Sequence, residues 1–331
     1  MRLPNIIRSQ QFSRELLEDL FKLSDAMRNR PGDFRDSLKD KIMINLFYEE
    51  STRTRMSFES AIKKLGGHVI GTENAEEFSS AAKGESLEDT IRVVSGYCDV
   101  IVLRHKEEGS SEKAAKLIDI PLINAGDGKG QHPTQAFLDV YTIWREFGKV
   151  DDLHIAMVGD LAHGRTVRSL VYLCSKFNNI NLTFVSPPHL KIGKDIKSHL
   201  DEHNISYDEI DDLNKILPVA NAFYLIRNQK ERMSEETKRA TKKYEEETGK
   251  FVINDDNIKL IREDARILHP LPHLGEIQLS FKTEQKDPRV AYFRQAQNGL
   301  YARMALLHHL LYRKSTPKKT YQVRMTSQLT Y

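Results

Sequence analysis

The sequence has few cysteines and no long apolar run. Its two cysteines, Cys98 and Cys174, lie among apolar residues, and their spacing indicates neither a disulfide framework nor a zinc site. We find no signal peptide and therefore expect reduced core thiols in a cytoplasmic protein. No apolar stretch approaches the length needed to span a bilayer. These absences predict a soluble globular protein without membrane partners.

An excess of charge of either sign is also missing. Lys+Arg at 50 against Asp+Glu at 47 leaves a net charge of +3, so the bulk charge predicts no nucleic-acid partner. The sequence contains no internal repeat and no low-complexity block. It also lacks a dinucleotide fingerprint, because Gly159 and Gly164 do not have the spacing G-x-G-x-x-G. A nucleotide-binding oxidoreductase is therefore disfavoured.

What the sequence does contain is material for two cores. Its 331 residues, 39% of them hydrophobic, exceed one typical domain. Short apolar runs alternate with helical segments, a pattern typical of α/β domains built on parallel sheets. We predict strands at 42–47, 68–71, 99–105, 121–125, 154–160, 182–185, 222–226 and 267–272.

Helical periodicity completes the predicted organisation. A helix over 134–147 is expected to bridge the domains. A long helix from Tyr292 to Leu311 carries an apolar stripe suited to packing back across the first domain. The stripe consists of Ala296, Leu300, Met304, Leu307 and Leu311. The charged segment from Lys238 to Gly249 predicts a solvated helix or loop, and the segment 76–86 a polar loop.

The strongest functional signal is the segment from Phe47 to Phe58, where a buried strand runs into a helix. Ser51 is a natural N-cap, and the helix N-terminus behind it attracts an anion. Arg53 and Arg55 add positive charge. We interpret this junction as a cradle for a phosphate.

Other strand ends deliver similar chemistry. Arg104 follows the strand at 99–105, and parallel sheets bind ligands at the carboxyl ends of their strands. His132 and Gln135 begin the helix after a glycine-rich approach and can direct polar groups at the same ligand. Arg227 follows the strand at 222–226. Two prolines lock the turn at 269–272, where a cis bond before Pro272 is expected.

Together these segments resemble the catalytic chains of the aspartate carbamoyltransferase family. The resemblance runs in order over nearly the whole chain. It rests on residues 47–58, Lys83-Gly84-Glu85, Arg104-His105, His132-Pro133-Thr134-Gln135, Gly164-Arg165-Thr166, Arg227 with 229–232, and His269-Pro270-Leu271-Pro272.

The resemblance implies an α/β fold of two domains, each a parallel sheet flanked by helices, with a C-terminal helix returning to the first domain. A carbamoyl phosphate domain would span 1–133 and be completed by 292–313. The interdomain helix would span 134–147, the aspartate domain 148–291 and a C-terminal tail 314–331. The implied reaction transfers the carbamoyl group of carbamoyl phosphate to L-aspartate without a metal or organic cofactor.

The resemblance also implies a role for each site residue. The phosphate would be held by Ser51, Thr52, Arg53 and Thr54. The carbonyl oxygen would face Arg104, His132 and Thr54, and the carbamoyl amide would face Gln135. The carboxylates of aspartate would be bound by Arg165, Arg227 and Gln229, and its amine by the carbonyls of Pro270 and Leu271. Glu49 would pair with Arg165 and Arg232 on domain closure. Ser79 and Lys83 would enter a neighbouring subunit's site, so the resemblance implies a homotrimer; it allows a regulatory chain or a dihydroorotase as further partner.

Some positions depart from the family pattern: His273, Gly275, Ile226 and the pair Ala162-His163. None belongs to the implied ligand set. Two alternatives remain beside the main interpretation. An ornithine carbamoyltransferase would have a similar phosphate half, but its substrate presents an ammonium that Arg227 would repel. A homologue that binds without turnover is disfavoured by the presence of every implied ligand.

Overall fold

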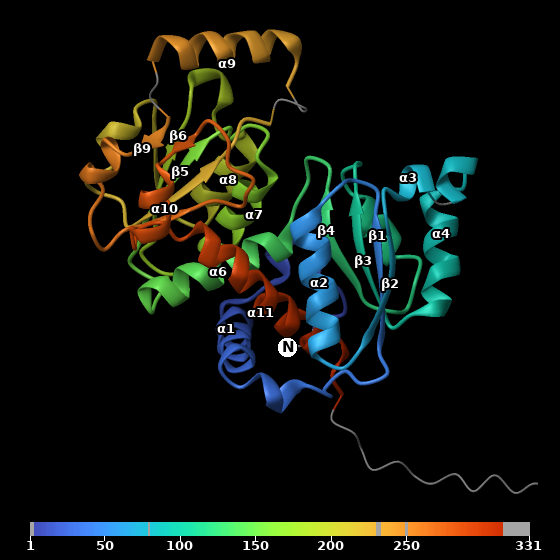
Figure 1. Cartoon of the computed structure of the whole chain (residues 1–331). Coiled ribbons are helices and arrows are strands. Elements are labelled where there is room, and N and C mark those ends of the chain that lie inside the picture. The colour runs from blue at the N-terminus through green and yellow to red at the C-terminus, as the bar shows by residue number, and fades with distance from the viewer. Residues whose placement is uncertain (1–2, 79, 230–232, 249–250, 314–331) are drawn as a thin grey trace, which may run out of the picture.

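The structure is a computed structural model that describes residues 3–78, 80–229, 233–248 and 251–313. It forms two α/β lobes side by side (Figure 1). Predictions placed on Ser79, on Arg232 and on the tail 314–331 lie outside these residues. Among the helices of the described ranges, none has the length and apolar character that crossing a bilayer requires.

The first lobe contains a four-stranded parallel sheet with the order β2-β1-β3-β4. Its strands are β1 (Ile42–Phe47), β2 (His68–Glu73), β3 (Val100–His105) and β4 (Leu122–Asp127). Most residues of β1, β3 and β4 are buried, as expected for strands covered on both faces. Phe47 pairs with Arg104 in the register, so β1 and β3 end side by side.

The second lobe contains a five-stranded parallel sheet with the order β10-β8-β5-β6-β7. Its strands are β5 (His154–Gly159), β6 (Asn181–Val185), β7 (Ser206–Ile210), β8 (Ala222–Ile226) and β10 (Arg266–Leu268). Strand β7 was not predicted from the sequence, because this edge strand is polar and half-exposed and lacks an apolar run. A small sheet pairs β9 (Ile253–Asn254) with β11 (Ile277–Gln278).

Both large sheets reverse their strand order at one internal position. In the first sheet the reversal lies between β1 and β3, and in the second between β5 and β8. The crevice outside the strand ends at such a reversal is where open α/β sheets bind ligands. Most of the segments predicted to bind substrate lie at the ends of these four strands, whereas His132 and Gln135 follow β4, and Pro270 and Leu271 follow β10.

The helices cover the sheets and connect the lobes (Figure 1). They are α1 (Arg14–Asn29), α2 (Thr52–Lys64), α3 (Ala75–Phe78), α4 (Leu87–Val94), α5 (Ser110–Ala115), α6 (Pro133–Phe147), α7 (Arg165–Cys174), α8 (Lys194–Glu202), α9 (Glu235–Thr248), α10 (Phe281–Lys286) and α11 (Tyr292–Leu311). The segment 76–86 differs from the predicted open loop, since α3 and a short 3-10 helix, Ser80–Lys83, occupy much of it.

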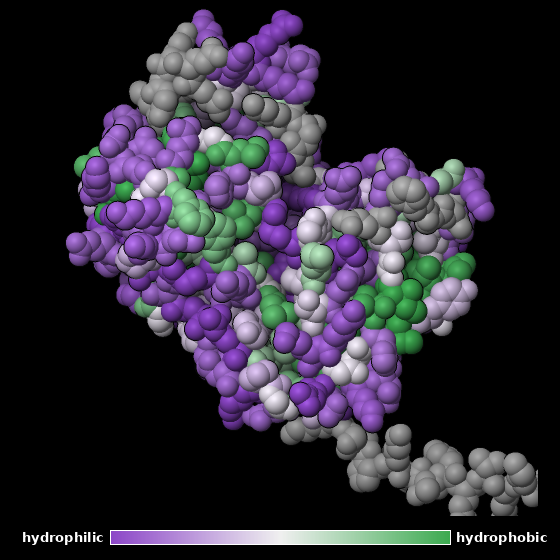
Figure 2. Space-filling model, in the orientation of Figure 1, coloured by the Kyte–Doolittle hydropathy of each residue, from purple (hydrophilic) through white to green (hydrophobic). Residues whose placement is uncertain are grey.

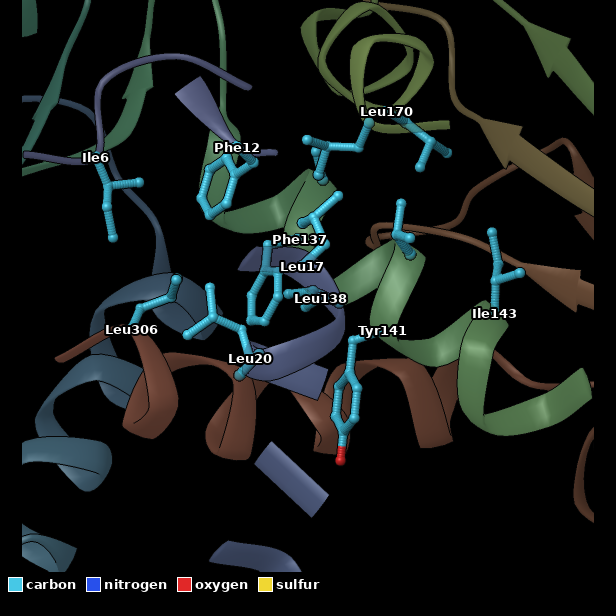
Figure 3. Close-up of a cluster of buried hydrophobic side chains, with 14 of the residues drawn as sticks. Ile6, Phe12, Leu17, Leu20, Phe137, Leu138, Tyr141, Ile143, Leu170 and Leu306 are labelled. Atoms are coloured by element: carbon cyan, nitrogen blue, oxygen red, sulfur yellow. The ribbon is translucent and has the colours of Figure 1, made fainter. Parts of the chain in front are cut away.

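A shared apolar core lies where α1, α6 and α11 meet (Figure 3). Phe21 of α1 stacks on Phe137 and Tyr141 of α6 at ring distances of 5.8 and 6.1 Å. Leu306 of α11 and Leu170 of α7 extend the same cluster. Burial of each large apolar side chain stabilises the fold by about 1.5 to 3 kcal/mol. This core therefore holds the two lobes together.

The buried face of α11 is more polar than the predicted apolar stripe. Met304, Leu307 and Leu311 are buried, but Ala296 is exposed. Gln295 and Arg303 are buried in its place. The prediction for Ala296 was wrong because part of this helix faces a polar cavity, which helical periodicity cannot reveal.

Candidate active site

A cavity of about 340 Å³ lies between the lobes at the ends of the sheets. The space-filling view shows a notch between the lobes that is lined mainly by hydrophilic residues (Figure 2). Twelve residues of the predicted site line this one cavity: Ser51, Thr52, Arg53, Thr54, Arg104, His132, Gln135, Arg165, Arg227, Gln229, Pro270 and Leu271.

The predicted phosphate end of the cavity is the start of α2. Ser51 occupies the N-cap position, but its side chain makes no capping hydrogen bond, contrary to the expectation for a natural cap. An α-helix provides no internal partner for its first amide groups. The first N–H groups of α2 and the positive end of its dipole therefore face the cavity, and the Ser51 hydroxyl does not occupy these N–H groups.

The two arginines of this helix have different surroundings. Arg53 lines the cavity, and burial lowers its pKa. Arg55 instead donates to Glu59 at 2.9 Å, one helical turn further on, and does not line the cavity. The interpretation that both arginines add charge to the cradle therefore holds only for Arg53.

Glu49 joins one arginine from each lobe. Its Oε2 lies 3.1 Å from Nη2 of Arg104 and 3.3 Å from Nη2 of Arg165. The contact with Arg165 was predicted for domain closure, whereas the contact with Arg104 was not. Arg165 also donates to the carbonyl of Gly128 at 2.8 Å. The carboxylate thus balances two buried or half-buried cations that face the cavity.

Gly126 allows these two guanidinium groups to approach β4. A Cβ atom at this position would lie 2.9 Å from Nη1 of Arg104 and 2.9 Å from Cζ of Arg165. Its φ of +113° is also unfavourable for any other residue. The close approach of two cations to one backbone position therefore requires glycine.

The start of α6 brings the second polar set. His132 is buried at the N-cap position, and its backbone N–H donates to Oγ of Ser169 on α7 at 2.9 Å. Pro133 begins the helix, where its missing N–H does no harm. Because Ser169 belongs to the second lobe, this bond ties the two halves of the site together.

The loops predicted to bind aspartate are held by Asp160, a residue that was not predicted from the sequence. This fully buried carboxylate accepts from the backbone N–H of Gln229 at 3.0 Å and from that of His163 at 3.1 Å. It therefore connects the loop before Arg165 with the loop after β8. Ile226 lies against Gly164, where a Cβ would come within 2.4 Å of its Cδ1. Gly164 therefore allows the close packing of Ile226 against the loop before α7.

The proline turn has the predicted cis bond between Leu271 and Pro272. The backbone N–H of Leu271 donates to Nδ1 of His269 at 2.8 Å. His269 is almost fully buried, and burial lowers its pKa. An imidazole that accepts a backbone hydrogen bond holds the turn, so that Pro270 and Leu271 line the cavity.

Two described residues of the predicted site, Glu49 and Lys83, do not line this cavity. Lys83 is exposed at the end of its 3-10 helix, and Ser79 and Arg232 lie outside the described residues. Conversely, Gln295 and Arg303 of α11 line the cavity, and the fully buried Asp139 lies behind it. The only signal for these residues was a polar side chain on an otherwise apolar helix face.

The arrangement suits the simultaneous binding of two anions. Arginine binds phosphate and carboxylate through two parallel hydrogen bonds, and each lobe provides such groups. Within the described ranges, no group of three or more His, Cys, Asp or Glu side chains is arranged to hold a metal ion. Fold and site define a two-domain α/β transferase that joins anionic substrates between its lobes.

Comparison with known proteins identifies the family. Residues 5–145 match the model for the carbamoyl-P binding domain of aspartate/ornithine carbamoyltransferases, and residues 151–310 match that for the Asp/Orn binding domain. The chain belongs to the aspartate/ornithine carbamoyltransferase family. The resemblance seen in the sequence is thereby confirmed.

Curated relatives agree with this assignment. The chain is 52% identical to aspartate carbamoyltransferase 1, chloroplastic, of Pisum sativum, over 94% of this chain and 79% of the relative. It is 42% identical to the aspartate carbamoyltransferase catalytic subunit of Clostridium novyi, over 93% of this chain and 97% of that protein.

Solved structures confirm the fold. The catalytic subunit of M. jannaschii aspartate transcarbamoylase aligns with a TM-score of 0.83 at 41% identity, covering 93% of this chain and 98% of that one. Aspartate transcarbamoylase from Trypanosoma cruzi, in complex with N-(phosphonacetyl)-L-aspartic acid, aligns with a TM-score of 0.85 at 36% identity, covering 93% and 95%.

Proposed function

We propose that this chain is an aspartate carbamoyltransferase, which transfers the carbamoyl group of carbamoyl phosphate to the amine of L-aspartate and releases phosphate. The observation that carries the proposal is the single cavity in which Arg53 and Arg104 of the first lobe meet Arg165 and Arg227 of the second. The relative from Trypanosoma cruzi has been crystallised with carbamoyl phosphate and aspartate.

The reaction needs positioning and charge stabilisation. The aspartate amine attacks the carbamoyl carbon, a C–N bond forms, and the bond from carbon to the phosphate oxygen breaks. Arg104, His132 and Thr54 would hold the negative oxygen of the tetrahedral intermediate, and the departing phosphate would take the amine proton. Holding both substrates in place contributes roughly 7 to 11 kcal/mol, and each oxyanion donor about 3 kcal/mol.

Aspartate is favoured over ornithine by the charge of the second lobe. Arg165 and Arg227 face the cavity, and a guanidinium attracts the side-chain carboxylate of aspartate but repels the ammonium of ornithine. A colorimetric assay of the purified chain, with carbamoyl phosphate and either amino acid in parallel, tests this. We expect carbamoyl aspartate and little citrulline, and the reverse outcome would overturn the assignment.

We also propose a homotrimer whose sites are shared between subunits. Lys83 lies outside the cavity of its own chain. Exposed apolar residues accompany it on the side of the first lobe that carries β2 and α4 (Figure 2). They include Ile70, Val93 and Tyr97, which are 57%, 52% and 62% exposed. An apolar surface of this kind favours contact with another chain.

A cytoplasmic location and a role in pyrimidine biosynthesis belong to the same proposal. The reduced state expected for Cys98 and Cys174 fits a reducing compartment, and both are free cysteines. The pea relative is named as chloroplastic. Microscopy of a fluorescent fusion in the source cells would decide between the cytoplasm and an organelle.

A further inference from the structure

A fully buried carboxylate, Asp139 of α6, lies behind the cavity and receives three side-chain hydrogen bonds. Its Oδ1 accepts from Nε2 of Gln135 at 2.8 Å and from Nε2 of Gln295 at 2.6 Å. Its Oδ2 accepts from the hydroxyl of Tyr224 at 2.8 Å. These partners come from α6, α11 and β8, so one carboxylate contacts both lobes.

The direction of these hydrogen bonds is set by a backbone group. The N–H of His269, which can only donate, donates to Oε1 of Gln295 at 2.8 Å. The other end of that amide, its NH₂ group, must then face Asp139. Oδ1 is therefore an acceptor, and the Gln135 amide must likewise present its NH₂ group to it.

The opposite end of the Gln135 amide faces the cavity. Gln135 lines the cavity wall, and no described residue donates to its Oε1. This oxygen is also not among the buried side-chain atoms that lack a partner, so solvent or a ligand in the cavity can reach it. The cavity thus contains an acceptor at a defined position on α6.

We infer that Asp139 is a positioning residue that keeps the carbonyl oxygen of Gln135 directed into the cavity, and that the site thereby selects an acyl phosphate bearing an NH₂ group over one bearing a methyl group. This inference rests on the proposed function. A carbamoyl group can donate to that oxygen, whereas an acetyl group would leave it unpaired. A hydrogen-bonding site rejects a ligand lacking the matching group because its own polar atom then stays unsatisfied.

Protonation of Asp139 would not reverse this selection. Burial raises the pKa of Asp139 to about 7, although hydrogen bonds from Gln295, Tyr224 and Gln135 and the charge of Arg303 oppose the rise. Burial raises the pKa of the nearby Cys174 thiol, and the charge of Asp139 raises it further. With Oδ1 receiving two N–H groups, a proton can occupy only Oδ2, where the hydroxyl of Tyr224 can accept it.

The test compares the dissociation constants of carbamoyl phosphate and acetyl phosphate, measured without aspartate. Asp139→Leu removes the acceptor at similar volume, and we expect it to lower the preference for carbamoyl phosphate by about tenfold or more. Asp139→Asn keeps an oxygen towards both glutamines and can donate to Tyr224, so its preference should equal that of the wild type. A purely structural role would weaken both ligands equally and leave their ratio unchanged.

Two further variants keep the test decisive. The hydroxyl of Tyr224 donates to the other oxygen of the same carboxylate. Tyr224→Phe removes this hydrogen bond, so it is the matched control and should retain the preference for carbamoyl phosphate. If Asp139→Leu does not fold, Asp139→Leu/Tyr224→Phe replaces both partners by apolar groups, which proteins tolerate better than one orphaned partner. An unchanged ratio in whichever leucine variant folds, or a loss in Asp139→Asn equal to that in the leucine variant, would overturn the inference. Failure of the wild type to make carbamoyl aspartate would instead overturn the proposed function.

Discussion

Arg104 and Arg165 share one oxygen of Glu49. An incoming phosphate or carboxylate therefore competes with a carboxylate that already holds the cations in place. The guanidinium groups are preorganised by this contact and by the backbone carbonyls of Ala125 and Gly128. Preorganised groups of this kind are the condition for effective electrostatic stabilisation.

Arg104→Ala tests the charge stabilisation. Loss of one oxyanion donor should lower kcat by roughly 100-fold or more, with the far-UV circular dichroism unchanged. The matched control is Arg55→Ala, because Arg55 pairs with Glu59 outside the cavity and its loss should leave the rate close to that of the wild type. A nearly normal rate for the Arg104 variant would remove this residue from the mechanism.

Gly126→Ala tests the close approach of the arginines. The added methyl group would lie 2.9 Å from both guanidinium groups. Because it would displace them by a fraction of an ångström, kcat/KM for both substrates should fall by about tenfold or more. Gly32→Ala is the control, because nothing lies within 4 Å of a Cβ built there. Wild-type kinetics in the Gly126 variant would show that this contact is not needed.

At the scale of elements, two reversals of strand order converge on one cavity. The residues predicted to bind phosphate lie mainly at the ends of β1 and β3, and those predicted to bind aspartate mainly after β5 and β8. The helix α6 lies between them and contributes both His132 and Gln135. Since each half belongs to a separate sheet, the contacts of α6 with its neighbours determine how accurately the halves face one another.

Glu146, near the end of α6, contacts one neighbouring element in each of two directions, β10 and α11. It accepts from Nε of Arg266 on β10 and from Nε of Arg294 on α11, both at 2.8 Å. Glu146→Gln should lower the free energy of unfolding by about 1 to 3 kcal/mol, measured by urea denaturation. Glu18→Gln is the control, because its partner Arg14 lies at the surface and such pairs contribute little.

The pH dependence of this contribution has a definite sign. Burial by itself would raise the pKa of Glu146, but hydrogen bonds from Arg294 and Arg266 outweigh it and lower the pKa below its ordinary 4.5. The stabilisation is therefore fully present above pH 4.5 and is lost as the pH falls through the lower, folded-state pKa. The difference between wild type and Glu146→Gln should shrink in acid, and a difference that grows there would contradict this assignment.

At the scale of the whole molecule, the proposed sharing of sites can be tested by mixing chains. Lys83→Ala and Arg53→Ala chains should each be inactive alone. If Lys83 serves the neighbouring site, mixed trimers contain some sites with both residues intact, and activity should partly return. Arg53→Ala mixed with Arg104→Ala is the control, because both residues line the cavity of one chain and no intact site can form. No recovery in verified mixed trimers would argue against sharing.

The sequence by itself determined most of the strands, the bridging helix and twelve of the residues that line the cavity. These features depend on local apolar periodicity and on polar residues that directly follow strands, such as Arg104 and Arg227. It also carried the family resemblance, because the motifs occur in order along the chain. The cis bond before Pro272 was also predicted, whereas the need for glycine at position 126 became evident only from the structure.

Only the tertiary structure decided which polar residues meet. The contact of Glu49 with Arg104 was not predicted, and neither was that of Asp139 with Gln295, which lies 156 positions further along the chain. Arg55 and Arg53 look alike in sequence, but one pairs with its own helix and the other faces the cavity. The physical reason is that a buried charge is stable only with its partners in place, and packing of distant elements alone determines what those partners are.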